Sequence, residues 1–415
     1  MHLFRAAILA VTLLAGCTPP PEPVQSTRTA EAVQPAPHPV ILISIDGFRP
    51  DYLGRGSTPN LDALAAEGLR AKGMRPSFPT KTFPNHYTLI TGLRPDHHGL
   101  VGNAIRDAAM PGVTFEPSNK AVANDPRWWN EAEPIWVTAE KAGVRTASMF
   151  WPGSAVAIHG VRPHDWRNFD ATVTPDARVD TVLGWYDRAP AERPRFTTLY
   201  FNRIDYAGHT WGPQSPKTAE AVAGVDEAIG RLRRGLAGRH IDADIIVVSD
   251  HGMAPVSEER VIRIAAIAPA GSYDVVADGP YAGIDPVPGH AVELAKALLA
   301  PHPDMTCNRK ADLPARLHYG TNPRVPAFIC IARIGWTILG GKTEEPVQGG
   351  AHGYDNREPD MMATFVAAGP DFRHGMVLDT FDNVDVYPLV MHLLGLKPRA
   401  NDGTMAPFAE ALKRP

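Results

Sequence analysis

From Val40 onward, short apolar runs alternate with segments of helical periodicity. The run from Val40 to Asp46 (VILISID) is almost uninterrupted by polar residues, which is typical of a strand buried on both faces. A helix is expected next, with Thr58 as its N-cap and Pro59 at its first position. Its apolar positions are Leu61, Leu64, Ala65 and Leu69. Further strands are expected at Arg145 to Phe150, Phe196 to Ile204, Ala243 to Ser249 and Ala363 to Ala368. This alternation restricts the chain to α/β architectures with a mostly parallel sheet covered by helices on both faces.

Composition agrees with a large globular protein. Hydrophobic residues make up 44% of the 415 residues and charged residues 21%, which excludes disordered, collagenous and multi-span membrane classes. The formal net charge of -4 argues against a nucleic-acid-binding surface, while a nucleotide remains possible as a small-molecule substrate. The segment from Pro152 to Pro194 is aromatic and rich in proline with weak periodicity, and we expect it to form inserted loops over the sheet.

The N-terminal 38 residues are expected to lie outside the folded domain. Arg5 and the apolar run Ala6 to Leu14 have the pattern of a signal peptide and are too short to span a bilayer. Leu14-Ala15-Gly16-Cys17 resembles the bacterial lipobox, in which the cysteine is lipidated, and a plain secretory signal is the alternative. Residues 18–38 are expected to be a disordered Pro-rich tether. We therefore expect an exported lipoprotein, anchored in the periplasm or cell envelope through Cys17 alone, with one catalytic domain at 39–415.

Export affects how the other two cysteines are interpreted. Because the periplasm is oxidising, Cys307 and Cys330 can form a disulfide there. Two separate buried thiols are the alternative, and the sequence does not decide between them.

Polar side chains occur where several predicted strands end. Asp46, Asp205 and Asp250 with His251 each follow an apolar run. In open α/β sheets, ligands bind beyond the carboxyl ends of the strands, so these side chains should converge on one crevice. His209 lies four residues after Asp205, a spacing that puts both on one face of a helix.

His352, in a Gly-rich run, completes a set of carboxylates and imidazoles that suits Zn²⁺ or another divalent transition metal. Each residue has a structural alternative when taken alone. Asp46 before Gly47 is equally typical of a turn, Asp205 of a helix cap, and an isolated His209 or His352 of a surface or core histidine. Their joint placement at strand ends favours a metal site.

A nucleophile candidate precedes a helical run. Thr82 stands before Pro84 and the apolar residues that follow it, so it is expected at a helix N-terminus, where free N–H groups attract phosphate. The alternative is an N-cap threonine without chemistry. Contact with a metal would favour ionisation of the Thr82 hydroxyl, and a two-metal site suits phosphoryl transfer.

Ordered blocks along the chain resemble a known family. They are ILISIDGFRPDYL, SFPTKTFPNHYTLITGL, HHGLVGN, MFWPGS, LYFNRIDYAGHTWGP, VVSDHGM, LPARLHYGTNPR and AHGYDNREPDM. Together they resemble the nucleotide pyrophosphatase/phosphodiesterase family of the alkaline phosphatase superfamily, from about Val40 to Leu396. The resemblance implies an alkaline-phosphatase-like three-layer α/β/α sandwich with two Zn²⁺ per subunit.

The resemblance also implies residue roles. One zinc would be held by Asp205, His209 and His352. The other would be held by Asp46, Asp250 and His251 together with Thr82, the nucleophile that forms a phospho-threonine intermediate. Asn103 matches an asparagine that donates to a phosphate oxygen. The substrate base would stack between Phe83 and Tyr200, and Trp151 is expected to shape the same pocket.

The expected function is hydrolysis of nucleotide phosphodiester and pyrophosphate bonds to nucleoside 5′-monophosphates, with a small-molecule substrate and no nucleic-acid partner. Relatives that cleave lysophospholipid or choline diesters are an alternative with the same metal core. A phosphate monoesterase would need extra cations near Trp151 to Ser154, and that segment has none. A sulfatase would need a Cys/Ser-x-Pro-x-Arg motif, which the sequence after Thr82 does not match. A zinc-binding lipoprotein without catalytic activity would leave Thr82 and Asn103 unexplained.

Overall fold

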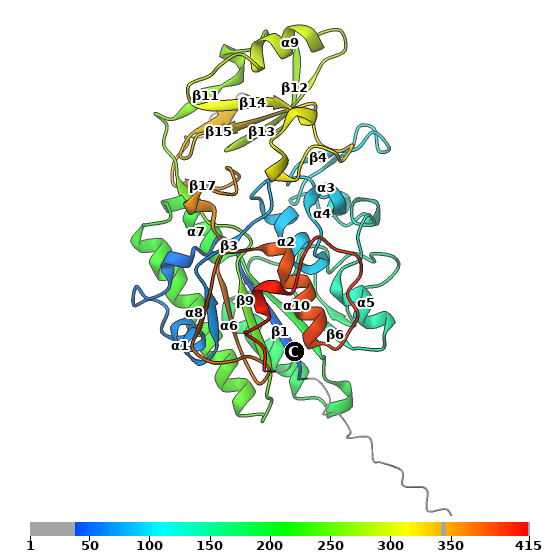
Figure 1. Cartoon of the computed structure of the whole chain (residues 1–415), viewed down its shortest axis with the longest axis vertical. Helices are drawn as coiled ribbons and strands as arrows, with labels where there is room; N and C mark the ends of the chain where they lie inside the picture. The colour runs from blue at the N-terminus through cyan, green and yellow to red at the C-terminus, as the bar shows by residue number, and fades with distance from the viewer. Residues whose placement is uncertain (1–37, 342–345, 414–415) are drawn as a thin grey trace, which may run out of the picture. The chain divides into compact units, whose positions relative to one another are not determined.

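The fold is organised around an eight-stranded sheet with the strand order β19-β2-β18-β9-β1-β8-β6-β7. In this computed structural model, which describes residues 38–341 and 346–413, β1 lies centrally and runs parallel to β8 and β9 (Figure 1). β6 and β7 continue the parallel arrangement, while β18 runs antiparallel to both of its neighbours. The strands are β1 (Val40–Ile45), β2 (Leu69–Ala71), β6 (Thr146–Met149), β7 (Asp165–Trp166), β8 (Phe196–Phe201), β9 (Asp244–Val248), β18 (Phe365–Ala368) and β19 (Met376–Leu378).

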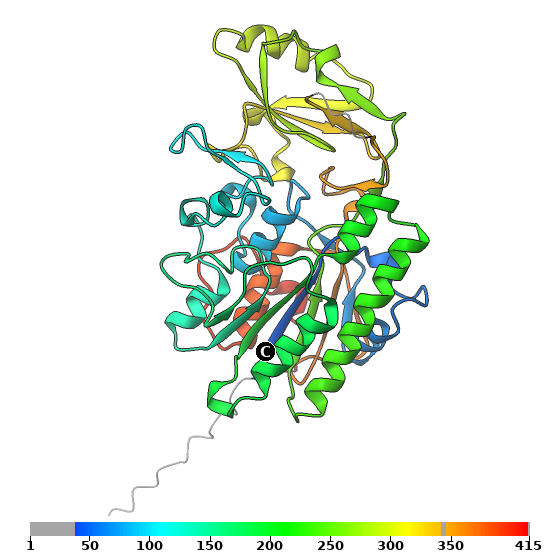
Figure 2. The same cartoon turned by 180° about the vertical axis from the view of Figure 1, so that it is seen from behind.

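Alternate residues of β1 face two different hydrophobic clusters, which makes the fold a three-layer sandwich. Val40 and Leu42 pack with α2 (Thr82–Thr91), α5 (Ile135–Lys141) and α10 (Val386–Leu393). Ile41, Ile43 and Ile45 pack with α1 (Pro59–Glu67), α6 (Pro175–Tyr186) and α8 (Pro216–Ala237) on the other face (Figure 2). Because successive side chains of a strand point to opposite faces of the sheet, the wholly buried strand β1 contributes to both hydrophobic clusters. The expected three-layer α/β/α fold with a mostly parallel sheet is confirmed.

A second, smaller sheet lies at the end of the molecule toward which β9 runs (Figure 1). It is antiparallel, has the order β12-β13-β15-β14, and shares a separate hydrophobic cluster with α9 (Ala291–Leu298). Its strands are β12 (Tyr273–Ala277), β13 (Tyr281–Pro286), β14 (Met305–Arg309) and β15 (Phe328–Ala332). Cys307 and Cys330 face each other across β14 and β15 and form a disulfide, which answers the question left open by the sequence.

Short elements connect these parts. Two-stranded pairings join β10 (Ala254–Pro255) to β17 (Gly350–Ala351), β11 (Val261–Arg263) to β16 (Thr337–Leu339), β3 (Met74–Arg75) to β20 (Phe381–Asp382), and β4 (Ile105–Arg106) to β5 (Thr114–Phe115). The remaining α-helices are α3 (Pro95–His98), α4 (Lys120–Ala123) and α7 (Arg203–Trp211).

Three details differ from the sequence-based expectation. The segment 152–194 is not only loop, because it contains α6, whose N-cap Thr174 accepts a hydrogen bond from the Ala177 N–H. The strand expected to reach Ile204 ends at Phe201, and α7 begins at Arg203. Leu69 belongs to β2 rather than to α1. The helix ends at Glu67 and is followed by its C-cap residue Gly68. A Cβ on Gly68 would lie 2.1 Å from the Ala367 carbonyl oxygen of β18, so only glycine allows this approach.

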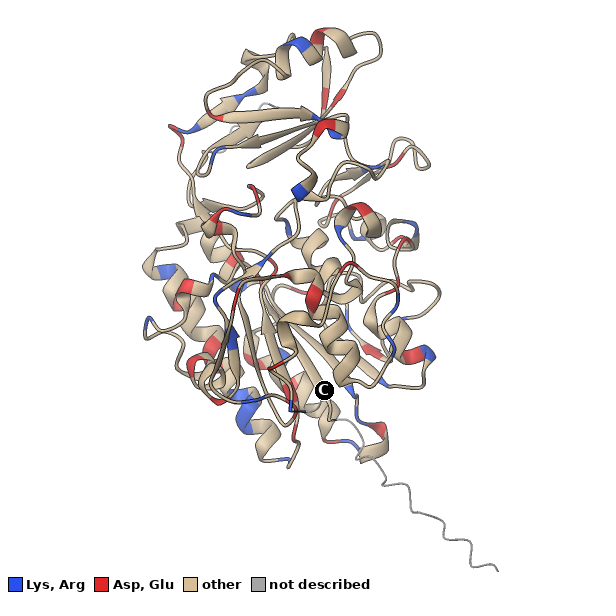
Figure 3. Ribbon diagram, viewed as in Figure 1, with Lys and Arg blue, Asp and Glu red and all other residues tan. Residues whose placement is uncertain are grey.

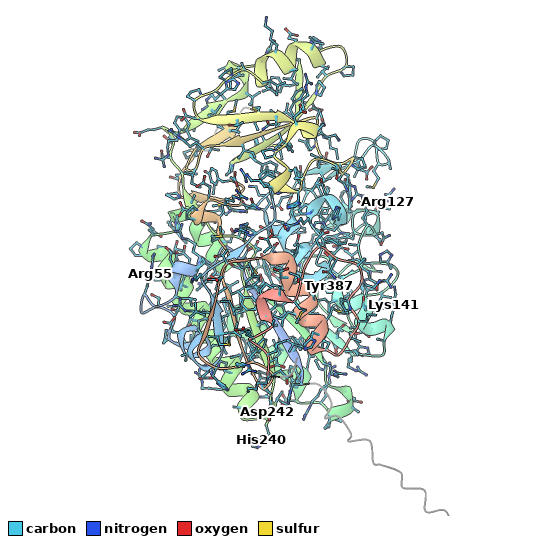
Figure 4. The ribbon with its side chains drawn as sticks, in the orientation of Figure 1. Arg55, Arg127, Lys141, His240, Asp242 and Tyr387 are labelled. Carbon is cyan, nitrogen blue, oxygen red and sulfur yellow. A yellow bond between two sulfur atoms is a disulfide. The ribbon has the colours of Figure 1, made fainter. Side chains whose placement is uncertain are left out.

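Charged residues of both signs are interspersed along the described elements (Figure 3). Arg55 and Lys141 project outward, whereas Tyr387 is buried within α10 and accepts a hydrogen bond from the Arg399 N–H (Figure 4). Within 38–341 and 346–413, no helix combines the length and apolar character needed to cross a membrane. The expected signal peptide, the lipobox Cys17 and nearly all of the tether lie outside the described residues.

Asp244, at the start of β9, is a buried carboxyl group whose titration should affect stability. Burial raises the pKa of Asp244 to about 7 from 3.8. The neighbouring Asp371 carboxylate adds to the rise, while the Asp371 N–H bond and His38 oppose it. The folded protein therefore keeps a proton that the unfolded chain releases. The free energy of unfolding should fall as the pH rises from about 4 to about 7, by about 1.4 kcal/mol for each unit of pKa difference.

Asp244→Asn should remove this loss of stability, because the amide imitates the protonated acid. Denaturant unfolding of the metal-loaded protein at about pH 5 and about pH 8 measures it. The control is Asp242→Asn, which changes an exposed carboxylate two residues away that is labelled in Figure 4. An Asp244→Asn protein with the wild-type pH dependence would contradict the assignment.

Candidate active site

Three carboxylates meet at the carboxyl ends of adjacent strands. Asp46 directly follows β1, Asp250 lies two residues beyond β9, and Asp205 lies in the first turn of α7 after β8. Because β9, β1 and β8 are neighbours in the sheet, their ends bring these side chains together. Gly47 has a φ of +68°, and a Cβ there would lie 3.1 Å from the Cα of Asp205. This glycine therefore permits the close approach of two carboxylate-bearing segments.

Three histidines present the same nitrogen to these carboxylates. The Nδ1–H groups of His209, His251 and His352 donate to backbone carbonyls at 2.7 to 2.9 Å. The acceptors are the carbonyl oxygens of Gly350, Gly252 and Thr80, respectively. These bonds assign the proton to Nδ1 and leave the lone pair of Nε2 free, as metal-ligating histidines require.

The side chains form two groups. The Nε2 atoms of His209 and His352 lie 3.4 and 3.7 Å from Asp205 Oδ1. In the other group, His251 Nε2 lies 2.9 Å from Asp250 Oδ2 and 3.5 Å from Asp46 Oδ1. The structure thus brings together all six Asp and His residues that the sequence selected. The potential ligand atoms of Asp205, His251 and His352 lie within 4.8 Å of one another, as do those of Asp46, Asp250 and His251. His251 therefore belongs to both groups, and the expected division of the six residues between two metal ions stays a prediction. His251 lies between the sets, since its ring stacks on that of His352 with centroids 3.5 Å apart.

The electrostatics of the two groups fit bound cations. One carboxylate oxygen each of Asp46, Asp205 and Asp250 is buried and has no hydrogen-bond partner among the described residues. Burial and the repulsion of neighbouring carboxylates raise the pKa of Asp46 and of Asp250 well above the ordinary value. Burial also lowers the pKa of His251 and of His352, which keeps both imidazoles neutral. Buried anions beside neutral imidazole nitrogens are the donor set of a divalent metal centre.

Thr82 is the first residue of α2 and lies beside the metal-ligand candidates. Its Oγ1 is 3.3 Å from His251 Nε2. His86, one turn further along α2, donates from Nδ1 to the Thr82 carbonyl oxygen at 2.8 Å, and its Nε2 accepts from the Ser44 hydroxyl of β1. The buried sheet therefore holds the start of α2 in place. These contacts of His86 have no signature in the sequence, because its partners are distant in the chain or are backbone atoms.

Asn103 is positioned next to the same helix start. Its Oδ1 accepts a hydrogen bond from the Phe83 N–H at 3.0 Å. This bond fixes the orientation of the amide group and leaves the Nδ2–H₂ donors of Asn103 available for another acceptor.

Phe83, the residue after Thr82, lines an aromatic cavity of about 330 Å³. All three aromatic residues selected from the sequence, Phe83, Trp151 and Tyr200, line it. Its other aromatic lining residues are Trp129, Phe150 and Phe169. Lys120 and Arg167 add two cations to the wall.

Tyr200 and Phe169 occupy different depths of this cavity. Tyr200 is only 7% exposed, and its hydroxyl donates to Asp46 Oδ2 at 2.5 Å. Phe169 is 38% exposed, packs edge-on to Tyr200, and lies near the buried guanidinium of Arg178. Phe169 therefore offers more free ring surface to a ligand than Tyr200 does. No periodic pattern in the sequence marks Phe169, because it lies in a loop before α6. The stacking role of Tyr200 remains a prediction.

The sandwich fold, with Asp and His groups at its strand ends beside a helix-terminal threonine, defines a hydrolase of the alkaline phosphatase superfamily. Comparison with known proteins narrows this class. The chain belongs to the type I phosphodiesterase / nucleotide pyrophosphatase family, whose model matches residues 40–355.

Relatives are similar over most of the chain. An uncharacterized pyrophosphatase/phosphodiesterase of Schizosaccharomyces pombe is 38% identical over 88% of this chain and 78% of its own length. Ectonucleotide pyrophosphatase/phosphodiesterase family member 3 of Rattus norvegicus is 37% identical over 91% of this chain, which spans only 44% of that relative. Human ectonucleotide pyrophosphatase/phosphodiesterase 5 superposes with a TM-score of 0.86 at 34% identity, covering 91% of this chain and all of that chain. An inactive threonine-to-alanine variant of the murine protein, solved in complex with AMP, has the same TM-score at 33% identity and the same two coverages.

Metal binding should stabilise the protein more at higher pH. Because the pKa values of Asp46 and Asp250 are raised, a cation must displace protons from these carboxyl groups. As the pH rises, the carboxyl groups bind fewer protons, so less free energy is needed to displace them. The test compares the melting temperatures of EDTA-treated and Zn²⁺-loaded protein at about pH 5.5 and about pH 8. The increase in melting temperature caused by the metal should be larger at the higher pH. Asp205→Asn should reduce the shift at both. Equal shifts at the two pH values would contradict a site built from these carboxyl groups.

Proposed function

We propose that this protein is a two-zinc phosphodiesterase and pyrophosphatase that hydrolyses nucleotide diester and pyrophosphate bonds through a phospho-threonine intermediate and releases nucleoside 5′-monophosphates. One observation supports this most directly: the Thr82 hydroxyl lies 3.3 Å from His251 Nε2, and the next residue, Phe83, lines an aromatic cavity large enough for a nucleoside. A reacting phosphate at Thr82 would therefore have cation ligands on one side and a base-binding surface on the other.

The residues around Thr82 prepare it for attack on phosphorus. The bond from His86 to the Thr82 carbonyl oxygen fixes the backbone, so the hydroxyl keeps its direction. At the start of α2, the Phe83 N–H is bonded to Asn103 Oδ1 and Pro84 has no N–H. The Thr82 N–H and the Nδ2 donors of Asn103 would therefore stabilise the charge that develops on the non-bridging oxygens. Bound zinc ions would supply Lewis acidity, which lowers the pKa of the Thr82 hydroxyl and neutralises charge on the leaving oxygen.

In the first step, the Thr82 oxygen would form a bond to the phosphorus attached to the 5′ oxygen of the nucleoside, and the leaving group would depart on the opposite side. Water would then hydrolyse the phospho-threonine and regenerate the hydroxyl. The inactive threonine-to-alanine variant of the murine relative supports a threonine nucleophile. The same structure contains AMP, the kind of product that this sequence of steps releases.

The cavity favours a nucleotide over a choline headgroup. Aromatic rings accept both a base and a quaternary ammonium, but a positive ligand would meet Lys120 and Arg167 in the wall. A neutral base with hydrogen-bond acceptors has no such repulsion. The bis(5′-adenosyl)-triphosphatase of Xenopus laevis, 36% identical over 88% of this chain and 80% of its own length, supports a dinucleotide or nucleotide substrate. Attachment to the cell envelope through a lipidated Cys17 remains part of the proposal, on sequence grounds alone.

Removal of the Thr82 hydroxyl should abolish turnover. Thr82→Ala is expected to keep the zinc content of the wild type, because the Asp and His ligands are unchanged, and to lose all activity on a nitrophenyl ester of thymidine 5′-monophosphate. Asn103→Ala should lower kcat by about 10² to 10³, as expected for the loss of one donor to the developing charge. Thr82→Ser, which keeps a hydroxyl, is the matched control. Turnover by a zinc-loaded Thr82→Ala protein would exclude Thr82 as the nucleophile.

Substrate choice distinguishes the proposed function from its alternatives. The zinc-loaded protein should cleave the nitrophenyl nucleotide ester orders of magnitude faster than a simple nitrophenyl diester or nitrophenyl phosphate, and EDTA should abolish this activity. Phe169→Ala should raise KM for the nucleotide ester by about tenfold with little effect on the simple diester, since stacking of one base contributes about 1 to 3 kcal/mol. Trp166→Ala, which removes a similarly exposed ring that does not line this cavity, is the control. Preference for the monoester or for the simple diester would contradict the nucleotide assignment.

A further inference from the structure

Lys81 is a cation next to the nucleophile that the function proposed above does not use. It is the N-cap residue of α2 and is half-buried. Its Nζ lies 5.9 Å from the ring centroid of Tyr281 in the small sheet. A Cβ placed on Gly353 would lie 2.8 Å from Cε and 3.2 Å from Nζ of Lys81. The ammonium therefore lies between the residue that follows His352 and the strand β13.

The ammonium group of Lys81 lacks a direct partner in the part of the chain that the structure describes. Among residues 38–341 and 346–413, no carboxylate lies within ion-pairing distance and no acceptor within hydrogen-bonding distance of Nζ. Asp205 and Asp278 attract it only from further away. Other lysines with buried or semi-buried ends are bonded, as in Lys310, which donates to the Val325 carbonyl oxygen. A shielded ammonium with unused donors beside a reaction centre is suited to an anionic ligand.

The position of Lys81 relative to the two ligand groups indicates which part of the substrate it faces. The Thr82 hydroxyl contacts His251, a member of the group with Asp46 and Asp250. The Lys81 side chain instead packs against Gly353, which directly follows His352, and its ammonium group is attracted electrostatically by Asp205. In an in-line displacement at a two-metal site, one metal lies at the attacking oxygen and the other at the leaving oxygen. Lys81 is therefore on the leaving-group side.

The nucleoside cavity lies elsewhere, because Lys81 is not among the residues that line it. The cations of that cavity, Lys120 and Arg167, are thus separate from Lys81 in position. A substrate whose base occupies the cavity and whose reacting phosphorus is at Thr82 would extend its leaving group toward Lys81.

We propose that Lys81 binds the phosphate chain of the leaving group and makes the enzyme selective for pyrophosphate bonds over simple nucleotide esters. The inference rests on the proposed function and names its preferred substrate class. As the Thr82 oxygen bonds to phosphorus, the bond from phosphorus to the leaving oxygen breaks and its electron pair stays on that oxygen. The leaving phosphate thereby gains negative charge opposite the Lys81 ammonium. Lys81 keeps its proton throughout, and the proton of the Thr82 hydroxyl passes to water.

Lys81→Met tests this with two substrates that share the adenosine 5′-phosphoryl group, ATP and the nitrophenyl ester of AMP. ATP leaves pyrophosphate, whereas the ester leaves a nitrophenolate without phosphate. We expect kcat/KM for ATP to fall at least tenfold more than kcat/KM for the ester. Lys72→Met, which changes an exposed lysine paired with Asp379, should leave both values unchanged.

Equilibrium binding provides a readout that does not need turnover. In the zinc-loaded Thr82→Ala protein, adding Lys81→Met should weaken ATP binding at least tenfold and leave AMP binding within about twofold. Equal losses on both substrates would overturn the proposal, because they are expected if Lys81 only supports the position of Thr82. Weaker binding of AMP would also overturn it, by placing Lys81 on the nucleoside side. A wild-type protein that cleaves neither substrate would contradict the proposed function, while the binding comparison would still decide the role of Lys81.

Discussion

The mutual repulsion of three carboxylates is the constraint on which the active-site end of this structure depends. Asp46, Asp205 and Asp250 are brought together because β1, β8 and β9 are adjacent and parallel. Each has a buried oxygen that no described donor satisfies. A fold that concentrates unpaired negative charge in this way is most stable when cations are bound, so the sheet topology and the metal requirement have the same physical origin.

Hydrogen bonds around this charge cluster fix the orientation of its histidine side chains. Backbone carbonyls fix the tautomers of His209, His251 and His352. The Thr82 carbonyl oxygen fixes that of His86, whose Nε2 then accepts from the Ser44 hydroxyl of β1. The histidines that point at the carboxylates are thus oriented by main-chain atoms, which do not change when side chains vary. The hydroxyl of Thr82 is oriented through the helix that His86 anchors. The metal-ligand candidates and the proposed nucleophile therefore share one support.

The parts of the structure that could be predicted are those with local causes. The strand from Val40 is evident from its uninterrupted apolar run, and Asp46, Asp205, Asp250 and His251 could be selected because they follow such runs. Helix α6 was missed although Thr174 and Pro175 mark its start, because the aromatic and proline content of the segment suggested loop. Phe169 and Lys81 could not be assigned, since their roles arise from contacts with residues far away in the chain. The buried bond from Tyr200 to Asp46 joins two strands and has no signature in either segment.

That same bond has a consequence for how substrate preference can diverge among related enzymes. The Tyr200 ring lines the aromatic cavity while its hydroxyl donates to the metal-ligand candidate Asp46. Under the proposed function, one residue would therefore serve both recognition and the catalytic centre. A substitution there would alter two properties at once, and selection for a new substrate would damage the chemistry that the substrate needs. In the described part of the chain, the Phe169 ring packs on the side chains of Phe150, Tyr200 and Arg178, none of which is a metal-ligand candidate. Evolutionary change in ligand choice should therefore concentrate in the loop before α6, while the strand β8 stays constant.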